Sequence, residues 1–186
     1  SRIIIVPYMQ YDVEKAFHIK FFNGHSQVSS ISPGKRKILL AFSGSTLSKT
    51  APFRADFKSE CDANIDCLFQ NLGNSRQVVK PEEIKQLYRD STFCAILGGD
   101  TRASKRIFDA IKASCIPVIF DPLLALPFAA DIPYEEMTIS APFIVSRSVV
   151  REVILTLREI PESKVCSMQS LLLKYRSYFS YFGEER

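Results

Sequence analysis

The stretch from Phe93 to Phe120, FCAILGGDTRASKRIFDAIKASCIPVIF, decides the class of fold that this chain can adopt. Its two ends, FCAIL and IPVIF, are uniformly apolar, as strands that are covered on both faces must be. Between them, Gly98-Gly99 leads into a helical pattern from Arg102 to about Ala113. This connection is long enough to bring the chain back to a parallel neighbouring strand. We therefore predict a βαβ unit in an α/β fold with a Rossmann-like open parallel sheet.

Elements of the same kinds are expected on both sides of this unit. Apolar β-branched runs predict strands, and prolines in first-turn positions followed by helically spaced apolar residues predict helices. We expect strands at 3–6 and 38–42, and helices at about 52–61, from 81, from 146, and from 161 to about 182. The aromatic stripe of the last helix is interpreted as core packing. The proline-spaced segment from 121 to 142 is expected to be irregular.

The composition indicates a globular domain with a sizeable core. Of the 186 residues, 46% are hydrophobic, and no run approaches 18 uninterrupted apolar residues, so no membrane span is predicted. We divide the chain into an amino-terminal segment from a domain junction, 1–34, and a larger domain, 35–186. The chain begins with Ser1 rather than Met. We therefore expect it to be part of a longer protein, with any membrane anchor upstream.

The charges argue against a nucleic-acid partner. Lys and Arg number 24 and Asp and Glu number 20, which gives a net charge of +4 with both signs mixed along the chain. The one basic run, Lys35 to Lys37, is short and typical of a solvated loop.

Five cysteines leave the redox state of the chain open. No pair has the Cys-x-x-Cys spacing, and His18 and His25 are far from the cysteines in sequence, so a zinc site is not expected. The cysteines are either buried thiols or disulfides formed in an oxidising compartment.

The helix after the two glycines has an unusual charge distribution at its start. Arg102, Lys105 and Arg106 lie where the helix dipole is already positive, an arrangement that costs stability unless an anion is bound there. Ligands of open parallel sheets bind beyond the carboxyl ends of the strands, and the free amides at a helix amino terminus favour phosphate. Asp100 adds negative charge at the same end, and we interpret it with Thr101 as a helix cap.

Arg106 and Asp109 suggest what the anion is. At 100° per residue, Arg102, Arg106 and Asp109 lie within about 60° of one another on the helix. A guanidinium group matches phosphate oxygens with paired hydrogen bonds, and a carboxylate one turn later can accept two ribose hydroxyls. The stripe therefore fits a diphosphate followed by a ribose. The alternative is an ordinary surface ion pair between Arg106 and Asp109, worth about 0.3 kcal/mol.

The chain also resembles the exostosin family, the inverting glycosyltransferases of family 47. The resemblance is dense over 84–128 and looser over 1–60, where Val6-Pro7-Tyr8 and the strand before Gly44 match family landmarks. Its central motifs are Tyr88–Cys94 (YRDSTFC), Gly99-Asp100-Thr101, Ser104, Arg106, Phe108–Ile111 (FDAI), Cys115–Ile119 (CIPVI) and Leu126-Pro127-Phe128. The resemblance implies a two-domain GT-B architecture, of which this chain would be mostly the carboxyl-terminal, nucleotide-sugar-binding half.

The resemblance also implies roles for individual residues. Arg106 would hold the donor diphosphate, and Asp109, where many relatives have Glu, would hold the ribose. Arg54 matches a family arginine near the donor phosphates. The remaining candidates line the phosphate pocket: Gly99, Thr101 and Ser104, with Arg102 and Asp100 as further contacts. The donor would be a nucleotide sugar, most simply a UDP-sugar, and no cofactor is expected.

The chemistry implied needs no metal. No Asp-x-Asp motif occurs in the sequence, and two arginines with a helix dipole would stabilise the departing diphosphate instead. A general base would be expected on the missing amino-terminal domain, so none is nominated here. Related proteins pair the positions of Cys94 and Cys115 in a disulfide, and Cys61 with Cys67 would form a second one. Both fit a Golgi lumen and an upstream transmembrane anchor.

Three positions depart from the family pattern. Leu97 stands where relatives often have Pro, Ser114 where they have Gly, and Ala125 where many carry Glu. The sequence thus predicts the donor-binding half of an inverting glycosyltransferase that acts on a glycan or glycoprotein, and that is inactive without its other domain. The alternative, favoured by Ala125, is a non-catalytic subunit that stabilises an active partner. Whether the protein forms a homodimer or heterodimer is left open.

Overall fold

The computed structural model describes residues 33–47, 52–72, 79–98, 104–144 and 146–179. Within this part of the chain, five parallel strands form one sheet in the order β2-β1-β3-β4-β5. Their bounds are β1 Ile38–Gly44, β2 Cys67–Asn71, β3 Ser91–Ile96, β4 Ile116–Ile119 and β5 Ile139–Ser140. The predicted α/β class with an open parallel sheet is therefore confirmed.

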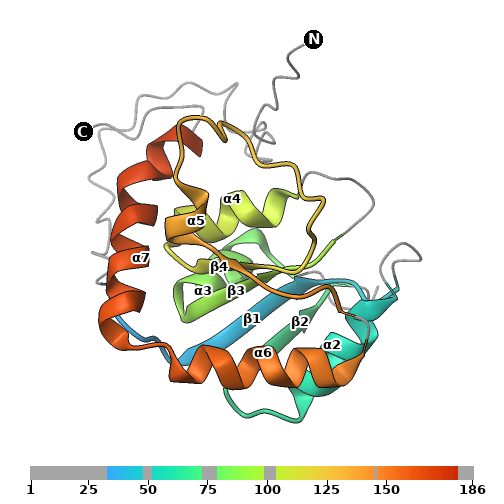
Figure 1. The fold of residues 1–186 in the computed structure, drawn as a ribbon. Helices are drawn as coiled ribbons and strands as arrows, with labels where there is room; N and C mark the ends of the chain where they lie inside the picture. The colour runs from blue at the N-terminus through green and yellow to red at the C-terminus, as the bar shows by residue number, and fades with distance from the viewer. Residues whose placement is uncertain (1–32, 48–51, 73–78, 99–103, 145, 180–186) are drawn as a thin grey trace.

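Helices cover both faces of the sheet (Figure 1). Their bounds are α2 Phe53–Asp62, α3 Pro81–Arg89, α4 Lys105–Lys112, α5 Tyr134–Met137, α6 Arg147–Glu159 and α7 Glu162–Tyr175, followed by the 3-10 turn η1 Arg176–Phe179. Helices α2 and α6 lie on one side of the sheet, and α4 lies on the other (Figure 1). The crossover through α2 leads from β1 outward to β2, whereas the crossover through α4 leads from β3 outward to β4. The strand order therefore reverses between β1 and β3, which makes the gap between their carboxyl ends the topological switch point.

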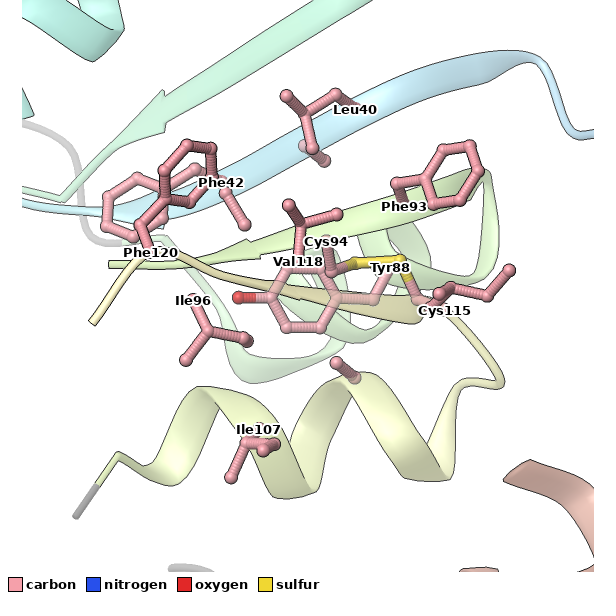
Figure 2. Packing of buried hydrophobic residues seen from close by; sticks show 14 of the residues in the cluster. Leu40, Phe42, Tyr88, Phe93, Cys94, Ile96, Ile107, Cys115, Val118 and Phe120 are labelled. Atoms are coloured by element: carbon pink, nitrogen blue, oxygen red, sulfur yellow. A yellow bond between two sulfur atoms is a disulfide. The ribbon is translucent and has the colours of Figure 1, made fainter. Parts of the chain in front are cut away.

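Aromatic rings join the sheet to α2. Phe57 of α2 packs edge-on against Phe42 and Phe120, with ring centroids 5.8 and 5.9 Å apart, and Phe69 lies 5.1 Å from Phe42. Figure 2 shows Phe42 and Phe120 together at one end of the strands, while the Cys94–Cys115 disulfide lies toward the other end. Phe42, Phe57 and Phe120 are buried, so this end of the core is tightly filled.

Most predicted elements are present, but strands β2 and β5 and the short helix α5 were missed, and the bounds of two helices differ. Segment 121–142, expected to be irregular, contains α5 and β5, and the last helix ends at Tyr175 and continues as η1 rather than as α-helix to about 182. Strands β2 and β5 were not predicted, because β2 is a half-buried edge strand and β5 has two residues. Helix α4 begins at Lys105 rather than at the predicted Arg102, since Ser104 is extended (φ −129°, ψ 122°). The strand predicted at 3–6 lies outside the described residues, and the domain boundary at 34/35 stays a prediction. No helix in the described ranges has the length and apolarity needed to cross a bilayer.

A half-buried arginine, Arg36, holds the amino-terminal edge of the sheet together. Arg36 Nη1 donates to the carbonyl oxygens of Tyr88, Ser91 and Ala113 at 3.2, 3.0 and 3.1 Å. Two of these carbonyls lie at the carboxyl ends of α3 and α4, where the helix dipole favours a cation. Burial lowers the pKa of Arg36 to about 10, and the nearby Asp90 opposes this shift.

Ion pairs fasten α6 to the opposite face. Glu60 of α2 is 2% exposed and accepts hydrogen bonds from Arg151 (2.9 Å) and Arg147 (3.3 Å) of α6. The hydrogen bond from Arg151 is the main cause that lowers the pKa of Glu60. Further along α6, Arg158 forms two hydrogen bonds of 2.9 and 2.8 Å with the Asp66 carboxylate. These contacts hold α6 against α2 and against the turn that leads into β2.

Candidate functional site

Arg106 lies at the switch point. Its Nε donates to the carbonyl oxygen of Ser43 at 2.7 Å, and its guanidinium carbon lies 5.1 Å from the centroid of the Phe42 ring. The Nη2 atom stands over Gly44, 2.9 Å from the place that a β-carbon on that residue would take. The side chain is half-buried, and no carboxylate of the described residues forms an ion pair with it. Arg106 therefore presents a positive charge at the carboxyl end of β1.

Arg54 approaches the same ring from α2. Its guanidinium carbon lies 5.5 Å from the Phe42 centroid, and the residue is 4% exposed. Nη1 donates to the carbonyl oxygen of Ser45 at 3.2 Å, and Nη2 donates to that of Gly98 at 2.6 Å. Arg54 thus ties the chain that leaves β1 to the chain that leaves β3, and its charge lies below the surface rather than on it.

Gly44 makes this arrangement sterically feasible. A β-carbon on Gly44 would lie 2.6 Å from two ring atoms of Phe42, closer than such atoms approach in proteins. The missing side chain lets the Phe42 ring fold under the strand end, where one guanidinium group reaches it from α2 and the other from α4. Cation–π contacts of this kind contribute about 0.5–2 kcal/mol, more when they are shielded from water. Phe42 was not among the predicted site residues, and the signal for it is the Phe-Ser-Gly sequence at the end of β1.

The amino terminus of α4 lies next to Arg106. Its N-cap is Ser104, not the predicted pair Asp100 and Thr101, and the Ser104 side chain makes no capping hydrogen bond. Ser104 is 8% exposed, and its Oγ is buried with no hydrogen-bond partner among the described residues. The first turn of α4 contains no acid, so Lys105 and Arg106 leave it strongly positive. The predicted site residues Gly99, Asp100, Thr101 and Arg102 lie outside the described residues.

Asp109 is placed differently from the expected surface pair with Arg106. Lys105 Nζ donates to its two carboxylate oxygens at 2.8 and 2.6 Å, and the Asp109 side chain is 12% exposed. Lys105 and Asp109 are four residues apart, so they lie on the same face of the helix. Arg106 bonds instead to the sheet. Asp109 therefore stays a predicted ribose ligand, and a ribose would share its carboxylate with Lys105.

Tyr88 has a buried hydroxyl close enough to Arg106 and Asp109 for both charges to act on it. The side chain is 1% exposed, and its hydroxyl oxygen has no hydrogen-bond partner of good geometry in the described ranges. Burial raises the pKa of Tyr88, Asp109 raises it further, and Arg106 and the Ser43 backbone oppose these effects. Tyr88 therefore stays protonated at physiological pH. Its neutral hydroxyl does not cancel the positive charge of Arg106.

The next strand end along the sheet has a carboxylate. Asp121 directly follows Phe120 at the end of β4 and is half-buried. Its Oδ1 accepts the backbone N–H of Leu123 at 2.9 Å. Its Oδ2 lies close to Gly98, because a β-carbon built on that glycine would be 3.1 Å from it. The carbonyl oxygen of Gly98 also accepts the hydrogen bond from Arg54 Nη2. Asp121 was not among the predicted site residues.

Two disulfides join the cysteine pairs suggested by the resemblance. Cys94 of β3 bonds to Cys115, which directly precedes β4, with a Cα–Cα distance of 5.7 Å (Figure 2). Cys61 bonds to Cys67 and closes the turn between α2 and β2, next to the Glu60 ion pairs. Cys166 is the free thiol of the described residues. In the same part of the chain, no three His, Cys, Asp or Glu side chains are grouped closely enough to hold a metal ion.

Two of the solved structures that resemble this chain share little sequence with it. The glycotransferase of kitacinnamycin matches at 13% identity with a TM-score of 0.45, covering 81% of this chain and 44% of that one. The GtfA/B complex matches at 10% identity with a TM-score of 0.48, covering 78% of this chain and 34% of that one.

Several Arabidopsis thaliana proteins are similar in sequence. The probable arabinosyltransferase ARAD1 is 27% identical over 185 residues, which is 96% of this chain and 37% of that protein. The probable xyloglucan galactosyltransferase GT20 is 28% identical over 99 residues, and the xyloglucan-specific galacturonosyltransferase 1 is 35% identical over 92 residues. These two matches cover 18% and 14% of the relatives, so the chain spans well under half the length of the proteins it matches. The family model described as the exostosin GT47 domain matches residues 2–157. The chain belongs to the exostosin GT47 family.

Proposed function

We propose that this chain is the donor-binding part of an inverting glycosyltransferase that transfers a sugar from a UDP-sugar to a glycan or glycoprotein acceptor without a metal ion. It would form the carboxyl-terminal half of a GT-B enzyme. The acceptor and the general base would then be placed by the rest of a longer, membrane-anchored protein in the Golgi lumen. This fragment by itself is expected to bind the donor and not to transfer its sugar.

One observation supports the proposal most strongly: Arg106 presents its charge at the topological switch point, beside the amino terminus of α4. Open α/β sheets bind their ligands at this point, and a positive helix end favours phosphate. The Arg106 side chain is half-buried, its Nε is fixed to Ser43, and no acid of the described residues neutralises it. A diphosphate would supply the negative charge that this arrangement requires.

The two arginines would contribute in different ways. Arg106 would contact a phosphate oxygen directly through its Nη groups, because only its Nε is bound to the sheet. Arg54 donates both Nη groups to backbone carbonyls and lies below the surface, so it would act by holding the strand ends and by its charge. As the glycosidic bond breaks, negative charge builds up on the departing diphosphate. Fixed cations and a helix dipole lower the energy of that transition state.

The relatives support the general reaction and leave the sugar open. Their names include arabinosyl-, galactosyl- and galacturonosyltransferases, which differ in the sugar and share glycosyl transfer. A sugar donor and an acceptor are therefore the partners that this homology implies. The alternative, a non-catalytic subunit that stabilises an active enzyme, is favoured by Ala125, where many exostosin relatives carry a glutamate.

Titration calorimetry with UDP tests the proposal. The wild-type chain is expected to bind UDP, and Arg106→Ala to weaken binding at least about tenfold, because a hydrogen bond to a charged group is lost. Arg89→Ala removes an exposed arginine from the end of α3 and serves as the matched control. Circular dichroism checks that both variants fold. Equal affinity in Arg106→Ala and wild type would refute the proposed site, and no heat with millimolar UDP would favour the non-catalytic subunit.

A further inference from the structure

The carboxyl-terminal edge of the sheet carries a carboxylate that the proposed phosphate contacts do not use. Asp121 follows β4, next to Gly98 at the end of β3. One of its oxygens accepts the Leu123 N–H, and the backbone carbonyl of Asp121 accepts the Leu124 N–H at 3.1 Å. The residue therefore closes its own turn and its side chain has a fixed direction. The second oxygen, Oδ2, lies against Gly98, and no ion pair to it is formed within the described ranges.

Gly98 lies between opposite charges. Arg54 Nη2 is 2.6 Å from its carbonyl oxygen, while Asp121 Oδ2 would be 3.1 Å from a β-carbon at the same residue. Along this edge, Arg106 places a half-buried cation at the end of β1, the buried Arg54 lies beneath the ends of β1 and β3, and Asp121 places an anion at the end of β4. A ligand that binds along this edge would need a negatively charged group near the end of β1 and hydrogen-bond donors near the end of β4. A sugar diphosphate has this order of groups.

We propose that Asp121 accepts hydrogen bonds from hydroxyl groups of the transferred sugar and thereby favours neutral sugars over uronic acids. This inference rests on the proposed function, because it assumes that a diphosphate occupies the switch point. With the diphosphate at Arg106, the ribose lies toward Asp109 on α4, and the sugar extends along the edge past Gly98. There the Asp121 carboxylate offers free lone pairs to sugar hydroxyls. The same charge repels the carboxylate of a uronic acid.

The glycine at position 98 is part of this argument. Any side chain there would occupy the space between the Arg54 contact and Asp121 Oδ2, and would also meet the Phe53 ring at 3.5 Å. The absence of a side chain therefore lets the Asp121 carboxylate lie close to the backbone of Gly98. A purely structural Asp121 would need only Oδ1, which closes the turn. Neutralising Oδ2 without losing the turn separates the two roles.

The experiment compares three ligands with the 186-residue chain by calorimetry: UDP, UDP-glucose and UDP-glucuronic acid. The two sugars differ only at C6, which is a hydroxymethyl group in glucose and a carboxylate in glucuronic acid. The main variant is Asp121→Asn, whose amide oxygen can still accept the Leu123 N–H. Asp131→Asn makes the same change at an exposed position and is the matched control. Asp121→Ser, which can also close the turn, is measured as well in case the Asn variant folds poorly.

The wild-type chain is expected to bind UDP-glucose about tenfold more tightly than UDP-glucuronic acid. Asp121→Asn should leave UDP affinity unchanged, weaken UDP-glucose about tenfold and bring the two sugar nucleotides to similar affinities. Asp131→Asn should change none of the three. If UDP binds and Asp121→Asn keeps the wild-type ratio between the two sugar nucleotides, the sugar contact is overturned while the proposed function stands. If the wild-type chain binds none of the three ligands, both are overturned.

Discussion

A single methyl group on Gly44 should damage both the core and the candidate site. In the Gly44→Ala variant, the new β-carbon would lie 2.6 Å from two atoms of the Phe42 ring and 2.9 Å from Arg106 Nη2. The backbone of Gly44 is not in the left-handed region, so alanine brings no conformational strain of its own. The cost therefore comes from the clash alone, and it depends on which neighbour can move.

Phe42 has little freedom to move. Its side chain is fully buried, and the rings of Phe57 and Phe69 lie 5.8 and 5.1 Å away from it. Overpacking a filled core costs about 1–3 kcal/mol of unfolding free energy. Alanine also lowers the conformational entropy of the unfolded chain, which stabilises the folded state by about 0.4–1 kcal/mol and offsets part of this cost. We therefore expect a net loss of about 1–2 kcal/mol, together with weaker UDP binding because the guanidinium group of Arg106 must be displaced.

Urea denaturation followed by circular dichroism gives the unfolding free energy, and calorimetry gives the UDP affinity. Gly98→Ala is the internal control, because its β-carbon would lie 3.1 Å from Asp121 Oδ2 and would meet the Phe53 ring only at an ordinary contact distance of 3.5 Å. Its stability should stay within about 0.5 kcal/mol of wild type, since the entropy gain offsets a small shift of Asp121. If Gly44→Ala is as stable as wild type and binds UDP equally well, Phe42 and Arg106 are not packed as described and the reasoning fails.

Three other changes test the contacts that hold the fold in place. Glu60→Gln should lower the unfolding free energy by about 1–3 kcal/mol at neutral pH. Because the folded-state pKa of Glu60 lies below its ordinary 4.5, the ion pairs stabilise the fold above pH 4.5, and this contribution is lost as the pH falls through the folded-state pKa. The urea midpoints of variant and wild type should therefore converge as the pH is lowered. Replacing Cys94 and Cys115 together by alanine should cost about 3 kcal/mol, since the disulfide closes a loop of 21 residues, and thermal unfolding with and without reductant measures this. Arg36→Ala should lower the unfolding free energy measured by urea denaturation by about 2–4 kcal/mol, because three carbonyl groups lose the charged donor that they share. A variant as stable as wild type would contradict that role.

The elements that the sequence predicts well are those in which one pattern dominates. The strands around Phe93 and Ile116 are buried on both faces, so their uniform apolarity distinguishes them from everything nearby. The edge strand β2 was missed because only half of its surface is covered, and a mixed sequence such as Cys67–Asn71 has no clear period. The start of α4 was placed too early because Asp100, Thr101 and Ser104 are all residues that favour an N-cap, and the sequence alone does not decide among them.

The candidate site was predictable in its residue types and less so in its contacts. Arg106 stands out because a cation in a first helical turn is unfavourable without a nearby anion. Its partner could not be read from the sequence, since Ser43 is 63 positions away and contributes a backbone carbonyl that any residue would have. Helical spacing allowed Asp109 to pair with Arg106 or with Lys105, and the choice depended on the sheet drawing Arg106 away. Asp121 carries no local signal, because its position next to Gly98 arises from the pairing of β3 with β4.

The contrast between the two arginines explains why one of them should bind a ligand. Desolvating a guanidinium group is costly, and the protein offsets that cost for Arg54 with two backbone carbonyls and the Phe42 ring. Arg106 shares the same ring but gives only Nε to the sheet, in a first helical turn that adds further positive potential. Arg106→Gln should therefore remove the stabilisation that added UDP gives to the wild-type chain, which thermal unfolding with and without UDP measures. A merely structural Arg106 would lower the stability of the free chain and leave the stabilisation by UDP unchanged.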